Sequence, residues 1–230
     1  MQDDYIILNN ESSFKNNIVV VELPSVSIPK ERIEEIEVLG LDGNLTISDG
    51  TYEPIIKKCK LYYEGNTYDA LVEFLKNSGT VIFSNVPDRF YYYKIINEIP
   101  LREIIENSWY EFEVTFKCQP FGYALNNDPV IIENKNTIIY NSGTYYAKPK
   151  ITIYGNGDIN LFIGDEQITL KDIKEYITVD TNKLRTYKDT IRQNHKKIGN
   201  YPILQKGENN ITWDGYISKI EIIPNWRYLM

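Results

Sequence analysis

The sequence contains very little cysteine and histidine. Its 230 residues include two cysteines, Cys59 and Cys118, and one histidine, His195. Two cysteines without a C-x-x-C spacing are too few for a disulfide scaffold. Each cysteine alternates in phase with apolar neighbours, so we predict that both are buried free thiols in a chain made in a reducing compartment. A bridge between them stays open as an alternative if their two strands are neighbours.

The usual catalytic and nucleotide-binding motifs are also missing. The sequence has no Walker A, H-E-x-x-H or G-x-S-x-G pattern. Gly155-Asn-Gly157 lacks the third glycine of a dinucleotide loop, and strand-like alternation follows it. His195, the one candidate base for a catalytic triad, lies in the polar stretch RQNHKKIGN. We therefore expect no catalytic residue, no cofactor and no metal site.

Two groups of carboxylates need a separate interpretation. Glu111 and Glu113 share one strand face about 6–7 Å apart, near the spacing that glycosidases use. Glu34, Glu35 and Glu37 form a second acidic group, which could also be interpreted as catalytic acids. Acidic residues at such spacing are common on wet strand faces. We interpret the first pair as solvated and the second group as solvated or facing an interface.

Long apolar runs and an excess of positive charge are absent. No run of 18 apolar residues occurs, and the terminus MQDDYIILNN is acidic, so we expect neither a membrane span nor a secretory signal. The net charge is −7. Residues 1–140 carry 12 Lys+Arg and 22 Asp+Glu, a net −10, whereas residues 141–230 carry 13 and 10, a net +3. The acidic first part argues against tight nucleic-acid binding, and the asymmetry predicts a domain boundary near residue 140.

Strand-forming residues dominate what is present. There are 19 tyrosines, and isoleucine, valine and threonine are frequent, which favours strands. WYEFEVTFKC (109–118) alternates strictly: Tyr110, Phe112, Val114, Phe116 and Cys118 share one face, which we expect to be apolar and buried. The strand ends at Pro120, since proline cannot donate to a sheet ladder.

The other predicted elements lie on both sides of this strand. One helix is expected in TYDALVEFLKNSG, over Asp69–Asn77, with Asp69 as N-cap and Gly79 at its end. Turns are expected at Gly40-Leu-Asp-Gly43 and Ser48-Asp-Gly50. The run FYYYKI is aromatic enough for a stacking platform, but an ordinary strand is the simpler interpretation. Further strands are expected at 5–8, 18–23, 80–84 and 90–99. After Pro129, strands are expected at 149–154, 159–163, 166–169, 176–179, 183–187, 203–205, 210–213 and 216–223, and their spacing of roughly ten residues is typical of a β-sandwich.

Several segments in this order resemble one family, the distal tail (Dit) proteins of siphophages. The first part contains LGLDGNL, then SDGTYEP, the short helix, a Pro-Asp-Arg-Phe-Tyr-Tyr stretch and the corner EFEVTFKCQPFGY. The second part contains NSGTYYAKPKITIYGNGDINLFI and closes with KGENNITWDGYISKIEIIPNWRYL. The resemblance covers nearly the whole chain.

The resemblance implies a mainly β fold of two β-sandwich-like domains. Residues 1–140 would form a ring-building domain with one short helix and a hairpin, and residues 141–230 a domain similar to galectins or carbohydrate-binding modules. It also implies a structural role without catalysis. A homo-hexameric ring at the virion tail tip, made in the bacterial host cytoplasm, would join the tail tube protein to the tail-tip protein and carry receptor-binding proteins. DNA would pass through the lumen without specific binding.

Two other classes remain as alternatives. A carbohydrate-binding module or lectin-like adhesion protein would expose an aromatic strip, for which Tyr145, Tyr146 and Tyr154 are candidates. The galectin sugar site uses His, Asn, Arg and Trp in a set spacing. This chain shows no such set, because His195 and Trp213 are far apart and out of pattern. An enzyme, such as a glycosidase or peptidase, would need a polar cleft with perturbed carboxylates.

Overall fold

The computed structural model describes residues 4–229 and divides into two compact units. The N-terminal unit extends to Gly122, and the C-terminal unit covers Tyr123–Tyr228. The division therefore lies earlier in the chain than the charge asymmetry at residue 140 predicted. The reason is strand pairing: β12 (Val130–Ile132) and β13 (Thr137–Asn141) both pair with β20 (Gly207–Ile223), so they fold with the C-terminal unit.

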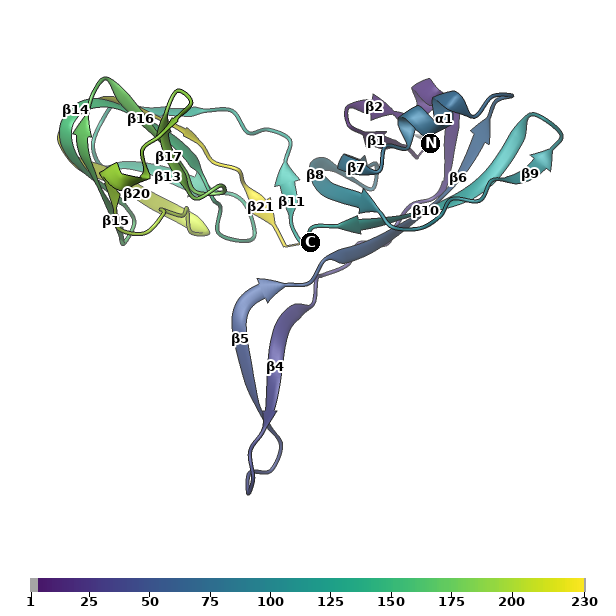
Figure 1. The fold of residues 1–230 in the computed structure, drawn as a ribbon, viewed down its shortest axis with the longest axis horizontal. Coiled ribbons are helices and arrows are strands. Elements are labelled where there is room, and N and C mark those ends of the chain that lie inside the picture. Colours follow the sequence, from purple (N-terminus) through teal and green to yellow (C-terminus); the bar gives the residue numbers. More distant parts are fainter. Residues whose placement is uncertain (1–3, 230) are drawn as a thin grey trace. The chain divides into compact units, whose positions relative to one another are not determined.

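The N-terminal unit is a curved antiparallel sheet in the order β2-β1-β7-β8-β10-β6-β3, with β9 paired to β10 (Figure 1). A separate hairpin, β4–β5, forms a sheet of its own. The bounds are β1 Ile6–Leu8, β2 Glu11–Ser12, η1 Ser13–Asn16, β3 Ile18–Glu22, β4 Glu31–Glu37, β5 Asn44–Tyr52, β6 Ile55–Glu64, α1 Asp69–Phe74, β7 Ser78–Phe83, β8 Val86–Ile95, β9 Arg102–Ile105 and β10 Trp109–Cys118.

The pairing of β6 with β10 organises this unit. The two strands stay in register over ten consecutive pairs, from Trp109 opposite Glu64 to Cys118 opposite Ile55. Phe112, Val114, Phe116 and Cys118 are buried on one face, as the alternation predicted. Phe116 packs against Tyr93 with ring centroids 5.1 Å apart, within the range of favourable edge-to-face pairs. The dry face of β10 is thus the centre of the first core.

The predicted helix is shorter than its sequence pattern suggests. It ends at Phe74, and Asp69 is its first residue, preceded by Tyr68 as N-cap. Residues 75–77, which the prediction placed in the helix, lie outside it, and the chain then enters strand β7. Asn77 O already accepts a hydrogen bond from Ile95 N of the neighbouring strand β8 at 2.9 Å. The sheet therefore overrides a helical propensity that is only a weak prior.

One buried charge in this core was not expected from the sequence. Lys57, on β6, is 3% exposed, and its Nζ lies 5.0 Å from the Tyr91 ring centroid and 5.7 Å from that of Phe83. Nζ also donates to the carbonyl oxygen of Ser25 at 3.5 Å. Burial lowers the pKa of this ammonium group. Aromatic faces, which attract cations through their ring quadrupole, thus surround the charge.

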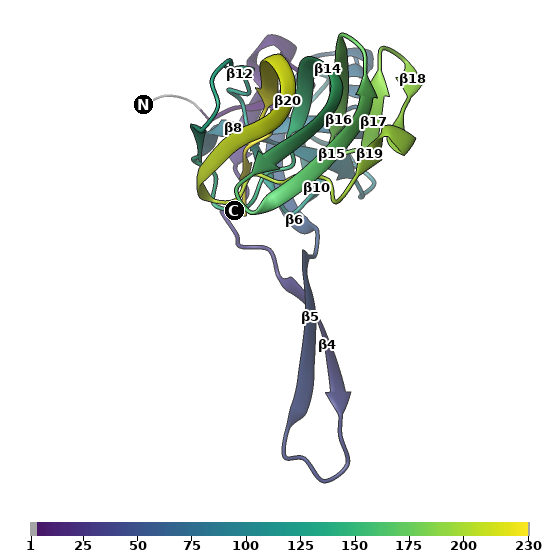
Figure 2. The same cartoon turned by 90° about the vertical axis from the view of Figure 1, so that its left-hand side faces the viewer.

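The C-terminal unit is a second antiparallel sheet, in the order β12-β20-β14-β16-β17-β18, and Figure 2 shows β20, β14, β16 and β17 side by side. β13 also pairs with β20, and β15 pairs with β14 and β19. Besides β12, β13 and β20, the bounds are β11 Gly122–Ala124, β14 Lys150–Ile163, β15 Glu166–Ile173, β16 Tyr176–Asp180, β17 Arg185–Lys188, β18 Ile191–Arg192, η2 Asn194–Lys196, β19 Lys197–Ile198 and β21 Arg227–Tyr228.

Four of the predicted strands merge, two by two, into two long continuous strands. The segments 149–154 and 159–163 merge into β14, and 210–213 and 216–223 merge into β20. The pairing of β14 with β20 slips between Tyr154 and Gly155 and again between Asn156 and Asn160, so the strands bend together instead of ending. Gly155-Asn-Gly157 lies inside β14, in agreement with its rejection as a dinucleotide loop. Segment 203–205 contributes an isolated bridge, Ala147 to Leu204.

Glycine is required at this bend. Gly215 has φ +96°, and a Cβ at this position would lie 2.4 Å from the carbonyl oxygen of Asp158. Gly157 has a similar φ of +80° but open space around it. A side chain at Gly215 is therefore opposed by both backbone strain and a backbone contact.

We expect Gly215→Ala to destabilise the C-terminal unit much more than Gly157→Ala does. The left-handed conformation alone costs an alanine about 1–2 kcal/mol, and overpacking at Gly215 adds roughly 1–3 kcal/mol. Denaturant unfolding of both variants and the parent chain measures the difference. Equal losses of stability would contradict the role assigned to the close approach of β14 and β20.

The two cysteines are free, and both are fully buried in the N-terminal core. Cys59 lies opposite Val114, and Cys118 lies opposite Ile55. Four residues of register therefore separate them, roughly 13 Å along neighbouring strands, too far for a disulfide. Burial raises the pKa of each thiol to about 12. The thiol prediction is confirmed, and the alternative of a bridge is wrong.

We expect both thiols to react slowly in the native chain. A pKa near 12, against the ordinary 9.0, leaves roughly a thousandfold less thiolate at pH 8. Labelling with a maleimide or disulfide reagent at pH 8, native and in urea, measures this. A Thr46→Cys variant, at an exposed position, should label rapidly in the folded chain. Rapid native labelling of Cys118 would contradict its burial.

Because the folded pKa of each thiol is raised, the thiols stabilise the fold below pH 9 and lose this contribution as the pH rises toward 12.

Candidate interaction surface

The β4–β5 hairpin has one apolar and one polar face. Residues directly opposite each other share a face, so Ile36 opposite Leu45, and Glu34 opposite Ile47, form the apolar face. Glu35 opposite Thr46, Glu37 opposite Asn44 and Ile33 opposite Ser48 form the polar face. In the sequence, Glu34, Glu35 and Glu37 form one acidic group, but the strand register places Glu34 on the opposite face from Glu35 and Glu37.

The apolar face has no cover from the described residues. Every residue from 31 to 51 is exposed, including Ile36 at 38%, Leu45 at 49% and Ile47 at 47%. The loop between the strands is apolar as well, with Leu39 fully exposed and Leu41 at 55%. A two-stranded hairpin is marginally stable on its own, and a contiguous exposed apolar patch marks an interaction site. We therefore take this apolar hairpin face, with its loop, as the candidate interaction surface.

The backbone of the hairpin is shaped by two glycine-containing irregularities. The predicted turn is present at the loop, where Leu41 N donates to Val38 O at 3.0 Å and Gly40 and Gly43 have positive φ. The second predicted turn, Ser48-Asp-Gly50, is instead a bulge within β5, because Tyr52 pairs with Glu31 and Ser48 with Ile33. Asp49 accepts hydrogen bonds from the hydroxyl and backbone N–H of Thr51, which lower its pKa.

The polar face carries carboxylates held by neutral donors. Asn44 Nδ2 donates to Glu35 Oε2 at 3.0 Å, and the Ser48 hydroxyl donates to Glu31. Within residues 4–229, no lysine or arginine nitrogen lies within 4.0 Å of a carboxylate oxygen of Glu35 or Glu37. The face therefore presents uncompensated negative charge.

The carboxylates of Glu111 and Glu113 both form salt bridges on the wet face of β10. Glu111 lies 2.6 Å from Lys60 Nζ and 3.4 Å from an Arg102 nitrogen, and Glu113 lies 3.1 Å from Lys58 Nζ. The hydrogen bond from Lys60 lowers the pKa of Glu111. A general acid needs a raised pKa, so Glu111 does not match that role. The side chain of Glu113 is 52% exposed, as expected for a solvated strand residue, whereas that of Glu111 is 15% exposed beneath its two cationic partners.

The proposed aromatic strip is not assembled as a sugar platform. Tyr145 and Tyr146 pack on each other, and the Arg227 guanidinium lies 4.5 Å from the Tyr146 ring centroid. Tyr154 packs instead near Tyr176, and Lys219 Nζ lies 4.4 Å from its ring centroid. Cations thus already occupy ring faces on which a sugar would stack.

The remaining sequence candidates lie apart from any common site. His195 is exposed in the short 3₁₀ helix η2, whereas Trp213 is 4% exposed in the core of the C-terminal unit. In FYYYKI, Tyr91 and Tyr93 are buried and Tyr92 is 44% exposed, the alternation of an ordinary strand. Over the described part of the chain, no three metal-ligating side chains gather, and no helix is long and apolar enough to cross a membrane.

Sequence reasoning missed the apolar face of the hairpin. The signal was present, because Leu45 and Ile47 alternate with Asn44, Thr46 and Ser48. That alternation alone does not show that the apolar side lacks a cover, because antiparallel strands commonly pack this side on a core.

The chain matches solved structures of phage tail proteins over nearly its whole length. No family model matches it, and a comparison with curated protein sequences finds no match. The structure described as "SPP1 Dit (gp 19.1) Protein, a Paradigm of Hub Adsorption Apparatus in Gram-positive Infecting Phages" aligns with a TM-score of 0.74 and 12% identity, covering 96% of this chain and 98% of that one.

Two structures of the phage p2 baseplate in its activated conformation also align. The chain from the calcium form gives a TM-score of 0.54 at 12% identity, and the chain from the strontium form gives 0.52 at 13%. Each alignment covers 96% of this chain, and 97% and 96% of the matched chains, respectively. Both units of the chain thus share the fold of a distal tail protein, as the sequence resemblance implied.

Proposed function

We propose that this chain is a structural distal tail protein, the hub of a siphophage or phage-like tail tip. The observation that carries the proposal is the TM-score of 0.74 to the SPP1 hub protein, with both units aligned. An ordered set of sequence segments independently resembles the same family. The role requires surfaces for assembly and no reacting group, so the proposal includes the absence of enzymatic activity.

The assembly we propose is a closed homo-hexameric ring built by the N-terminal unit. Ring closure requires two different complementary surfaces on each subunit. The uncovered apolar hairpin face, around Ile36, Leu45 and Ile47, supplies one of them. In an assembly this face would be removed from water, and burial of apolar area is the dominant favourable term in association. The number six comes from the family resemblance.

Residues 1–122, which form the N-terminal unit, carry 11 Lys+Arg and 20 Asp+Glu, a net −9. This acidic charge fits a channel that carries DNA without binding it. Negative charge repels phosphate, and attraction to DNA depends on Lys and Arg. Glu35 and Glu37, on the polar hairpin face, are candidates for the lining of this lumen. The ring would connect the tail tube protein with the tail-tip protein and carry receptor-binding proteins, at the tail tip of the virion.

We predict that charge on the apolar hairpin face blocks ring formation. Leu45→Lys/Ile47→Lys places two ammonium groups where apolar surface should be buried, at an expected cost of several kcal/mol per contact. Asn44→Lys/Thr46→Lys is the matched control, because it adds the same charge to the polar face of the same strand. All four positions are exposed, so the chain itself should fold in both variants.

Light scattering of the purified chains and cryo-electron microscopy of tail tips carrying them measure the outcome. The parent and the control should enter a ring, and the apolar-face variant should not. Equal incorporation of both variants would exclude this hairpin face as a ring contact. A tail tip in which the chain occupies any place other than a ring around the central channel would overturn the proposed function itself.

A further inference from the structure

The C-terminal unit contains a basic pocket of about 390 Å³, lined by Lys183, Arg185, Tyr187, Asp189, Thr190 and Arg192. All six residues come from strands β17 and β18 and the turns beside them. Tyr187 pairs directly with Arg192 across the two strands, so these side chains share a face. Arg185 lies two residues from Tyr187 on β17 and therefore faces the same side.

The positive charges in the pocket are weakly compensated. Within residues 4–229, no carboxylate oxygen lies within 4.0 Å of a guanidinium nitrogen of Arg185 or Arg192, whereas nearby Lys188 and Lys196 pair with Glu175 at 2.6 Å and Asp172 at 3.2 Å. Lys183 has a loose contact of 3.9 Å with Asp180, a carboxylate that is 4% exposed. Two guanidinium groups are thus left for a ligand.

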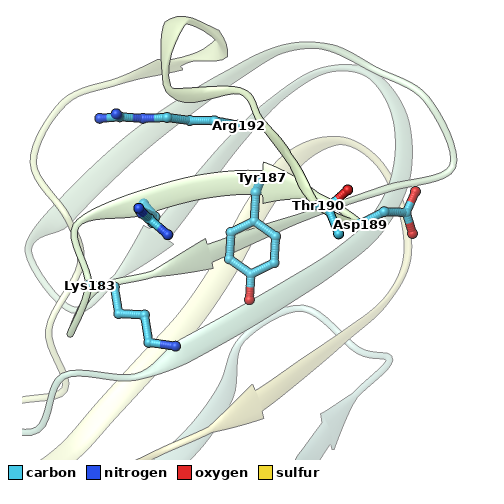
Figure 3. Close-up of a pocket in the computed structure, with 6 residues that line it drawn as sticks. Lys183, Tyr187, Asp189, Thr190 and Arg192 are labelled. Carbon is cyan, nitrogen blue, oxygen red and sulfur yellow. The ribbon is translucent and has the colours of Figure 1, made fainter.

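The one carboxylate lining the pocket lies away from its basic end. Figure 3 shows Lys183 and Arg192 at one end and Asp189 at the other. Asp189 accepts a hydrogen bond from the Tyr176 hydroxyl, outside the pocket. Tyr187 is half-buried, and desolvation, with the Asp180 charge, raises its pKa, so its hydroxyl stays protonated at neutral pH. The pocket therefore combines cations with an aromatic ring and the hydroxyls of Tyr187 and Thr190.

We propose that this pocket binds a phosphate group carried on a small hydroxylated scaffold, such as a sugar phosphate or polyol phosphate. Guanidinium groups form paired hydrogen bonds to phosphate oxygens, and these charge-assisted bonds are among the strongest in proteins. The volume falls within the range of small-ligand sites and exceeds what a phosphate needs. The ring of Tyr187 and the hydroxyls of Tyr187 and Thr190 match the apolar faces and hydroxyls of a sugar or polyol.

The geometry favours a compact ligand over nucleic acid. Tight nucleic-acid binding neutralises many phosphates along a strip of positive charge, whereas this pocket is formed by six residues between 183 and 192. The site lies entirely within the C-terminal unit and is independent of the ring contact. Loss of phosphate binding would therefore leave the proposed hub function intact, and loss of the ring would leave the pocket intact.

Titration calorimetry of the full chain with glycerol 3-phosphate, glucose 1-phosphate and inorganic phosphate tests the proposal. Arg185→Gln/Arg192→Gln should weaken binding of both organic phosphates by at least about tenfold, because each lost charge-assisted hydrogen bond costs more than a neutral one. Lys171→Gln/Lys206→Gln, two exposed lysines outside the pocket, removes the same charge and should leave binding unchanged. Tyr187→Ala should weaken the organic phosphates more than inorganic phosphate.

Three results would overturn the proposal. The first is no binding of either organic phosphate by the parent chain at millimolar concentration. The second is an equal loss in the Arg185→Gln/Arg192→Gln and Lys171→Gln/Lys206→Gln variants, which would indicate general electrostatic attraction. The third is tighter binding of a single-stranded or duplex oligonucleotide than of the sugar phosphates, with the same dependence on Arg185 and Arg192. Unfolding curves of all variants confirm that each one is folded.

Discussion

The structure depends on one constraint of antiparallel sheets: successive side chains point to opposite faces, so each strand has a dry and a wet side. In the N-terminal unit, the ten-pair register of β6 and β10 brings Cys59, Leu61, Val114 and Phe116 together on the dry face. In the C-terminal unit, β14 and β20 do the same with isoleucines such as Ile151, Ile153, Ile220 and Ile222. A shift of one residue in either pair would expose a whole core.

The β4–β5 hairpin follows the same rule without a core of its own. Its register separates Ile36, Leu45 and Ile47 from Glu35 and Glu37, but nothing among the described residues covers the apolar side. An element of this kind gains its stability from a partner. The ring contact proposed for this chain therefore uses a surface that the described residues leave uncovered. The basic pocket on β17 and β18 is a separate feature of the other unit.

Much of the fold could be predicted because strand alternation is a local property. The faces of 109–118, the end of the strand at Pro120 and the phase of both cysteines follow from neighbouring residues alone. Elements whose ends depend on distant partners were predicted less well. The helix from Asp69 was predicted to reach Asn77 but ends at Phe74, because Asn77 already bonds to Ile95 of β8 as the chain enters the sheet. The strands 149–154 and 159–163 were separated at glycines that instead let β14 bend against β20.

The sequence by itself determined the mainly β class, the burial of Cys59 and Cys118, the absence of known catalytic motifs and the resemblance to distal tail proteins. Only the tertiary structure decided where the two units divide, since residues 130–141 join the C-terminal unit through pairing with β20. It also decided that Lys57 is buried against aromatic rings, that Glu34 and Glu35 face opposite sides of a hairpin, and that Arg185, Tyr187 and Arg192 share a pocket. The physical reason is that each of these outcomes depends on cross-strand register and on what covers a face, which join residues that are distant in sequence.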